Sequence, residues 1–167
     1  YGRKAGFLVE HYIISSGMRE IIKSTSIADE FKRIYACRYY YDETHTATWP
    51  AQVVNYTAKT QYIFRINKQV LDVNDDADLN KYVPKTERPI PFERMIYIAD
   101  GLTDVPCMRL VKEYGGKSIA VYSSNDAVAK SLKDVGRVNY IAKADYSSGS
   151  EMEQIVQSIL DHMKADE

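Results

Sequence analysis

Short apolar runs alternate along the chain with longer segments in which apolar residues recur at helical spacing. A short apolar run is typical of a buried strand, and the longer periodicity is typical of a helix with one buried face. The runs predict strands at 9–14, 31–41, 95–99, 118–122 and 138–142. The periodic segments predict helices at 18–28, 57–68, 105–114 and 125–135, and a last helix after residue 150. Alternating strands and helices predict a mostly parallel sheet with helices on both faces, a three-layer α/β fold.

Individual residues refine these elements. Thr57 suits the N-cap of its helix, and Ser150 with Glu153 forms a capping box for the last helix. Gly136 follows a periodic segment, where glycine commonly ends a helix. The inner face of the helix at 18–28 is expected to consist of Ile21, Ile22 and Ile27. One face of the strand at 31–41 is expected to carry Ile34, Ala36 and Tyr40.

Two segments interrupt the pattern. Residues 42–50 are polar and are expected to form a turn, and residues 71–91 contain many acids and three prolines, as a surface loop does. The residues with the alternate spacing of a calcium-binding loop are Asp72, Asn74, Asp76 and Asp78. Ala77 stands where that loop needs glycine, and Val83 stands where it needs glutamate. We therefore reject a calcium site in this segment.

Composition narrows the class of protein. A chain of 167 residues is long enough for one domain with a core, so we expect one domain over 1–167, with a loop insertion at 69–91. The net charge of −1 gives no electrostatic footprint for nucleic acid or for an anionic membrane. No apolar run approaches the roughly 20 residues of a membrane-spanning helix. We therefore expect neither a nucleic-acid nor a membrane partner.

The cysteines and the first residue add two expectations. Cys37 and Cys107 lie far apart and form no paired motif, so neither a disulfide framework nor a zinc site is indicated. Two free thiols suit a reducing compartment, which favours the cytoplasm. The chain begins at Tyr1 rather than at methionine, and we expect it to be a piece of a longer protein.

The most informative stretch joins the strand at 95–99 to the helix at 105–114. Asp100 follows the strand directly, Gly101 permits a tight turn, and Asp104 precedes the helix. Ligands of open α/β sheets bind at the carboxyl ends of the strands. Two carboxylates that converge there suit Mg²⁺, which is typically held by one or two acids with water and substrate phosphate. The alternative is that Asp100 caps the turn and Asp104 caps the helix.

A second strand is expected to end at residues that can bind an anion. Ser15, Ser16 and Gly17 follow the predicted strand at 9–14 and enter the predicted helix at 18–28. A hydroxyl group, free amides and the positive end of a helix favour phosphate at such a place. The alternative is that a serine simply caps the helix.

Lys59 lies in the first turn of its predicted helix, where a cation is unfavourable unless an anion is near. The alternative is an ordinary solvated lysine on the surface.

Taken in order, these residues resemble the conserved motifs of the haloacid dehalogenase superfamily. Residues 13–17 resemble its second motif, Lys59 its third, and residues 97–104 its fourth, which is the most specific of the three. The resemblance covers most of the chain. It implies a Rossmann-like core and phosphoryl transfer through an aspartyl-phosphate intermediate with Mg²⁺ as cofactor and a small phosphorylated substrate.

The resemblance also implies roles for individual residues. Ser15, in the Ser15-Ser16-Gly17 turn, would hydrogen-bond the transferring phosphoryl group, and Lys59 would neutralise its charge. Asp100 would bind Mg²⁺ directly, and Asp104 would bind or orient it through water. Dehalogenation is less expected than phosphate chemistry, because displacement of a halide needs no cation.

One motif of that superfamily is absent. Its first motif is a strand that ends in Asp-x-Asp and supplies the nucleophile, whereas the Asp-x-Asp here, at 76–78, follows no predicted strand. The chain therefore resembles the carboxyl-terminal portion of such an enzyme. We expect the missing strand to lie between the strands that precede Ser15 and Asp100. The absent amino-terminal segment or another chain would then complete the sheet.

Two functions remain open on these grounds. The parent protein is expected to be a Mg²⁺-dependent phosphatase, although this chain alone would be inactive without the nucleophile. The alternative is a non-catalytic module of the same fold that binds Mg²⁺, phosphate or a partner.

Overall fold

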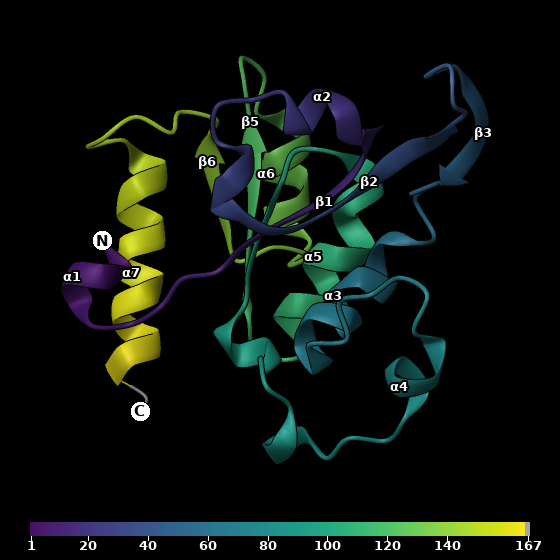
Figure 1. The fold of residues 1–167 in the computed structure, drawn as a ribbon. Coiled ribbons are helices and arrows are strands. Elements are labelled where there is room, and N and C mark those ends of the chain that lie inside the picture. The colour runs from purple at the N-terminus through teal and green to yellow at the C-terminus, as the bar shows by residue number, and fades with distance from the viewer. Residues whose placement is uncertain (166–167) are drawn as a thin grey trace. The chain divides into compact units, whose positions relative to one another are not determined.

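The computed structural model describes residues 1–165 and divides the chain into two compact units (Figure 1). One unit comprises residues 2–64, and the other comprises Tyr1 together with the chain from Arg65 onward. Both units combine helices and strands, so the predicted α/β class is confirmed. Whether the chain behaves as a single domain with an insertion at 69–91 stays a prediction.

The unit that begins at Arg65 is built on a parallel sheet. Its strands are β4 (Ile96–Ala99), β5 (Lys117–Tyr122) and β6 (Tyr140–Lys143), in the spatial order β4-β5-β6. All three overlap predicted strands, and their parallel pairing is as predicted. The connections between them carry α5 (Val105–Glu113) and α6 (Ala127–Asp134). The last helix of the unit is α7 (Glu151–Ala165).

Helices cover both faces of this sheet (Figure 1). On one face α5 and α6 pack against β5 in a cluster that includes Met108, Ala120 and Leu132. On the other face α7 packs through Met152, Ile159 and their neighbours against Ile119, Val121 and Ala142. Successive residues of a strand point to opposite faces, so β5 supplies both cores. This unit has the three-layer arrangement that the sequence predicts.

The predicted helix ends in this unit are largely confirmed. Ser150 Oγ accepts a hydrogen bond from the Glu153 amide at 3.2 Å, as in a capping box. The Glu153 carboxylate accepts from the amide of Gly149 rather than from that of Ser150. After α5 the chain passes so close to Phe92 that a Cβ on Gly116 would lie 2.4 Å from the Phe92 carbonyl oxygen. Only glycine fits there without a shift of the backbone.

Helix α6 buries only some of its apolar residues. Leu132 is buried, but Val128 and Val135 are exposed.

The segment between α3 (Lys59–Lys68) and β4 is ordered by the last turns of that helix. It contains α4 (Asp76–Asn80) and the 3₁₀ helices η2 (Lys85–Glu87) and η3 (Phe92–Arg94). The Arg65 guanidinium donates to three carbonyl oxygens in 72–75 and to Asp76 Oδ1. Asn67 donates to the Ile90 carbonyl at 2.7 Å. The loop predicted at 71–91 is therefore held by buried side chains.

The unit of residues 2–64 contains a mixed sheet. Strand β1 (His11–Met18) pairs in parallel with β2 (Phe31–Tyr41), and β2 pairs antiparallel with β3 (Ala47–Gln52). Its helices are α1 (Gly2–Ala5), α2 (Arg19–Lys23) and the 3₁₀ helix η1 (Ala28–Glu30), and α3 begins in this unit. The bounds of β2 are those predicted.

The prediction for residues 9–28 is wrong in two respects. The strand does not end at Ile14 but continues through the serines to Met18, because pairing resumes at Met18 and Cys37 after an irregularity. The helix is also shorter than predicted. Ser24 and Thr25 hydroxyls bond the carbonyls of the preceding turn, and Ile21 and Ile27 are exposed.

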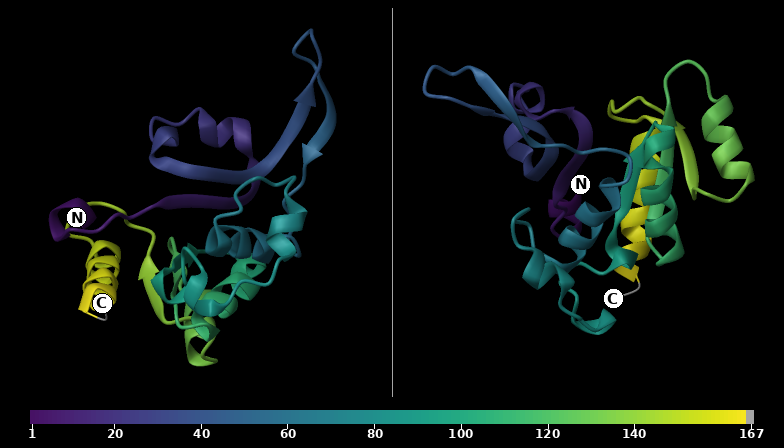
Figure 2. Two further views of the ribbon diagram at one scale, coloured as in Figure 1. Left: turned by 60° about the horizontal axis from the view of Figure 1, so that its bottom comes forward. Right: turned by 90° about the vertical axis from the view of Figure 1, so that its right-hand side faces the viewer.

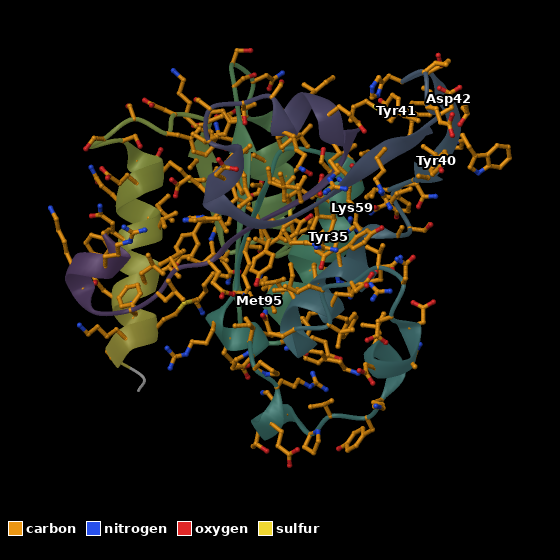
Figure 3. All side chains as sticks on the ribbon, viewed as in Figure 1. Tyr35, Tyr40, Tyr41, Asp42, Lys59 and Met95 are labelled. Carbon is orange, nitrogen blue, oxygen red and sulfur yellow. The ribbon has the colours of Figure 1, made fainter. Side chains whose placement is uncertain are left out.

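The turn predicted at 42–50 is confirmed only over 42–46, because residues 47–50 belong to β3 and the turn closes a β-hairpin. The hairpin extends beyond α2 (Figure 2), with Tyr40, Tyr41 and Asp42 toward its end (Figure 3). Tyr40 lies opposite Trp49, and these side chains are 64% and 71% exposed, so Tyr40 is not part of a buried face. Pro50 is tolerated because β3 is an edge strand.

The amino end of α3 also differs from the prediction. Asn55, not Thr57, accepts hydrogen bonds in the turn that leads into the helix. Its Oδ1 accepts from the amides of Thr57 and Ala58 at 3.1 and 3.0 Å. Tyr62 and Ile63 are buried, and the Tyr62 ring stacks on Tyr35 with the centroids 4.5 Å apart.

Candidate functional site

The acidic pair lies at the carboxyl end of β4. Asp100 follows the last residue of that strand, as the sequence predicts, and it is exposed. The 3₁₀ helix η4 (Leu102–Asp104) then leads into α5, and the Asp104 amide donates to the Gly101 carbonyl at 3.0 Å. This turn places both acids at the edge of the sheet where ligands of α/β proteins bind.

Asp104 is held differently from a simple helix cap. It occupies the N-cap position of α5, but in the described structure its carboxylate accepts no capping bond from that helix. Its side chain is 6% exposed, and Oδ1 accepts a hydrogen bond of 2.7 Å from the Tyr97 hydroxyl. Thr103 Oγ1 lies 3.4 Å from Oδ2. The capping alternative for Asp104 is therefore correct for its position but not for its side chain.

Tyr97 is a site residue that sequence reasoning missed. Burial raises the pKa of Tyr97 above its ordinary value, and the neighbouring Cys107 and Asp104 raise it further. The hydroxyl therefore stays protonated at neutral pH and can act as a donor. In the sequence, Tyr97 stands out as a single hydroxyl-bearing residue in an otherwise aliphatic strand. The sequence does not show which residue this hydroxyl contacts.

Gly101 lies close to Oδ2, the second carboxylate oxygen of Asp104. A Cβ at this position would lie 3.2 Å from Asp104 Oδ2 and 3.4 Å from Thr103 Oγ1. The backbone angle φ of −99° is ordinary, so close approach rather than backbone freedom explains the glycine.

Tyr146, in the loop between β6 and α7, lies near Asp100. Burial and the charge of Asp100 both raise its pKa.

Asp100 and Asp104 are the two acids to which the sequence assigns a magnesium ion. Among the described residues, no group of three or more His, Cys, Asp or Glu side chains converges as a complete metal site. Two acids fit the usual Mg²⁺ arrangement, in which water and substrate phosphate supply the other ligands. Asp100 is the accessible acid, and the buried Asp104 is fixed by a neutral donor.

Ser15, Ser16, Gly17 and Lys59 belong to the unit of residues 2–64, whereas both acids belong to the other unit. Ser15 lies inside β1, and its Oγ accepts a hydrogen bond from the Gly17 amide at 3.0 Å. The predicted serine turn after a strand is wrong, and α2 has only five residues.

Lys59 is the first residue of α3 and is 5% exposed, so the alternative of a solvated surface lysine is wrong.

The acids of the rejected calcium pattern have structural roles. Asp72 Oδ1 accepts from the Asn74 amide at 2.9 Å, and Asp75 Oδ1 accepts from the Asp78 amide at 3.0 Å. Asp76 pairs with Arg65, and Asp78 pairs with Lys81.

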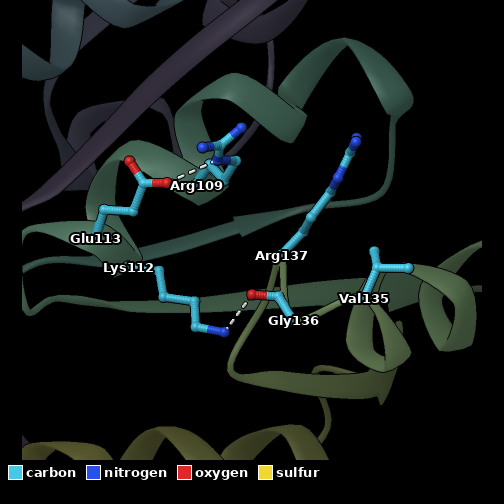
Figure 4. Close-up of a pocket in the computed structure, with 6 residues that line it drawn as sticks. All are labelled: Arg109, Lys112, Glu113, Val135, Gly136 and Arg137. Carbon is cyan, nitrogen blue, oxygen red and sulfur yellow. Dashed lines mark hydrogen bonds and ion pairs between the residues drawn. The ribbon is translucent and has the colours of Figure 1, made fainter.

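A hollow of about 370 Å³ lies elsewhere on the same unit, between the end of α5 and the loop before β6 (Figure 4). Because α5 runs from the carboxyl end of β4 to the amino end of β5, this hollow is at the opposite end of the sheet from Asp100. Arg109 is paired with Glu113 at 2.7 Å, and Lys112 donates to the Gly136 carbonyl. Its basic groups are thus largely engaged within the protein.

In the part of the chain that the structure describes, no helix is both long and apolar enough to cross a membrane.

Comparison with known proteins gives one relative of interest. The chain is 31% identical over 161 residues to an uncharacterized protein of Borreliella burgdorferi, across 86% of this chain and 55% of the relative. The chain thus spans little more than half the length of that relative. No protein-family profile matches the chain. No solved structure matches it.

Proposed function

We propose that the chain is part of a Mg²⁺-dependent phosphatase that resembles the haloacid dehalogenase superfamily and acts on a small phosphomonoester. The observation that carries this proposal is the acidic pair at the carboxyl end of β4 in a parallel three-layer unit. Asp100 is accessible there, while Asp104 is buried and hydrogen-bonded. Phosphoryl transfer depends mainly on positioning and on charge neutralisation, which such groups supply.

Each residue then has a defined role. Asp100 would bind the cation directly, and Asp104 would bind it or orient it through water. A bound Mg²⁺ neutralises charge on the phosphoryl oxygens. By the same resemblance, Lys59 would supply a cation to the transferring group; it is buried at the start of α3. Ser15, which lies inside β1, would donate a hydrogen bond to a phosphoryl oxygen.

The nucleophile would come from outside this chain. In the proposed reaction a carboxylate attacks phosphorus, the ester bond to the alcohol breaks, and the alcohol leaves with a proton. Water then cleaves the aspartyl phosphate and releases inorganic phosphate. Among the described strands, β1 pairs only with β2 and β4 pairs only with β5. Each sheet therefore has an open edge, at β1 in one unit and at β4 in the other.

A second function is favoured by one specific observation. The Asp-x-Asp at 76–78 lies in α4, where both acids are engaged by basic side chains. It therefore offers no nucleophile at a strand end. A non-catalytic module that binds Mg²⁺, phosphate or a partner would need only the groups that this chain supplies.

Titration with Mg²⁺ tests the cation site. We expect weak, saturable binding that shifts the NMR signals of the Asp100 and Asp104 carboxyl carbons, because two acids alone hold the ion loosely. Asp100→Asn should abolish the response. Asp134→Asn, at the exposed end of α6, is the matched control and should leave it intact. An unchanged response in Asp100→Asn would show that the metal assignment is wrong.

A further inference from the structure

The two oxygens of Asp104 have different surroundings. Oδ1 accepts the 2.7 Å hydrogen bond from Tyr97. Oδ2 lies on the side of the turn, where it accepts a longer hydrogen bond of 3.4 Å from Thr103 Oγ1 and lies 3.2 Å from the position that a Cβ on Gly101 would take. A carboxylate with one oxygen fixed by a directed hydrogen bond keeps its other oxygen in a defined direction.

The donor of this hydrogen bond is itself held firmly. Tyr97 lies in the middle of β4, which pairs residue by residue with β5, and it packs against the cluster that contains Val105 and Met108. A side chain in this setting has few alternative rotamers, because the strand and the core fix its direction. The hydroxyl is thereby presented to Asp104 at the start of α5.

We propose that Tyr97 is a positioning residue for the cation site, holding Asp104 Oδ1 so that Oδ2 remains on the side of the Gly101 turn. This inference rests on the proposed function, because it assigns Tyr97 to the Mg²⁺ site formed by Asp100 and Asp104. Residues that orient metal ligands by hydrogen bonding typically change metal affinity by about 10–100-fold when they are replaced.

Tyr97→Phe tests the inference because it removes only the hydroxyl group. In the full chain we expect Mg²⁺ affinity to fall by about tenfold, measured from the Asp100 carboxyl-carbon shift during titration. The Asp104 carboxyl-carbon signal should already be displaced without the ion. A purely structural role would lower the unfolding midpoint but would leave the affinity of the folded protein unchanged.

Tyr122→Phe is the matched control. Tyr122 ends β5 and packs against the same cluster, but among the described contacts it has no hydrogen bond to either acid. Its replacement should leave Mg²⁺ affinity unchanged. Wild-type affinity in Tyr97→Phe would overturn the inference even if Asp100→Asn abolishes binding. A wild-type chain without any saturable response would instead remove the proposed metal site, and the inference with it.

A measurement on the unsubstituted chain keeps the test decisive if Tyr97→Phe does not fold. The ring carbon that bears the Tyr97 hydroxyl should shift during the Mg²⁺ titration with the same midpoint as the Asp104 carboxyl carbon. The corresponding Tyr122 carbon should not shift. A Tyr97 signal that stays constant while Asp104 responds would overturn the inference.

Discussion

At the scale of single residues, Asp42 shows how one carboxylate organises a turn. Its Oδ1 accepts hydrogen bonds from the Thr44 hydroxyl at 2.7 Å and from the amides of Thr44 and Thr46 at 2.9 Å each. The Thr44 hydroxyl and these amides lower the pKa of Asp42 below its ordinary value. The ionised carboxylate therefore stabilises the hairpin turn.

The pKa shift predicts a pH dependence with a definite sign. Because the folded pKa lies below the unfolded one, the contribution is complete above the unfolded pKa and is lost as pH falls through the folded pKa. Asp42→Ala should therefore be less stable than wild type near neutral pH, and the difference should shrink in acid. Urea unfolding at several pH values measures it. Glu43→Ala, at the next exposed position, should show no comparable trend.

The position of the acidic pair could be predicted from the sequence, but the hydrogen bond that holds Asp104 could not. The apolar run of β4 ends just before Asp100, and such a run can be recognised in the sequence alone. The bond from Tyr97 to Asp104 depends on which face of β4 meets the start of α5, so it could not be predicted. Ser15 was misplaced because strand pairing across an irregularity leaves no periodic signal.

At the scale of elements, the end of α3 fixes the segment that follows it. Arg65 is 1% exposed and donates to four acceptors between residues 72 and 76. A long basic side chain was expected at the surface, and instead it orders a segment that has no periodicity of its own. Its burial could not be inferred because its partners are mainly backbone carbonyls.

Replacement of that arginine should loosen the segment. Arg65→Met leaves part-buried carbonyl oxygens without their donor, and we expect a loss of about 1–3 kcal/mol in the free energy of unfolding. Limited proteolysis should then cut within 71–81 more readily. Arg109→Met is the control, because Arg109 forms an exposed pair with Glu113 and such pairs contribute little. Equal proteolysis of wild type and Arg65→Met would contradict the proposed role of Arg65.

The hairpin shows a different limit of sequence reasoning. Strand β3 contains Pro50 and pairs with β2 through two register shifts, so its side chains do not alternate cleanly. Proline and polar residues are typical of turns, which is why the segment was expected to be one. An edge strand tolerates them because one side of its backbone needs no partner.

At the scale of the whole molecule, the proposed function predicts what the chain does alone. We expect no hydrolysis of p-nitrophenyl phosphate by the pure 167-residue chain, because covalent catalysis needs a nucleophile at a strand end. Release of p-nitrophenol at several Mg²⁺ concentrations measures it. Mg²⁺-dependent turnover that Asp100→Ala abolishes would reveal a nucleophile within this chain. The same activity in Asp100→Ala would point to a contaminating enzyme.

The α/β class and the parallel sheet could be predicted from the sequence, because strands and helices differ in the spacing of their apolar residues. The division into two units was not expected, since no glycine- or proline-rich linker lies near the boundary at residues 64 and 65. That boundary falls inside α3, and a continuous helical pattern gives no sign of it.

The order of the strands in the parallel sheet affects how the chain folds. Strands β4, β5 and β6 are neighbours in space in the order in which they occur along the chain. Each crossover therefore closes a shorter loop than a connection that skipped a strand would, and shorter loops lose less entropy on closure. Because Asp100 and Asp104 lie within the first crossover, the acid pair depends on the pairing of β4 with β5 and on the packing of α5, and not on the docking of β6 or α7.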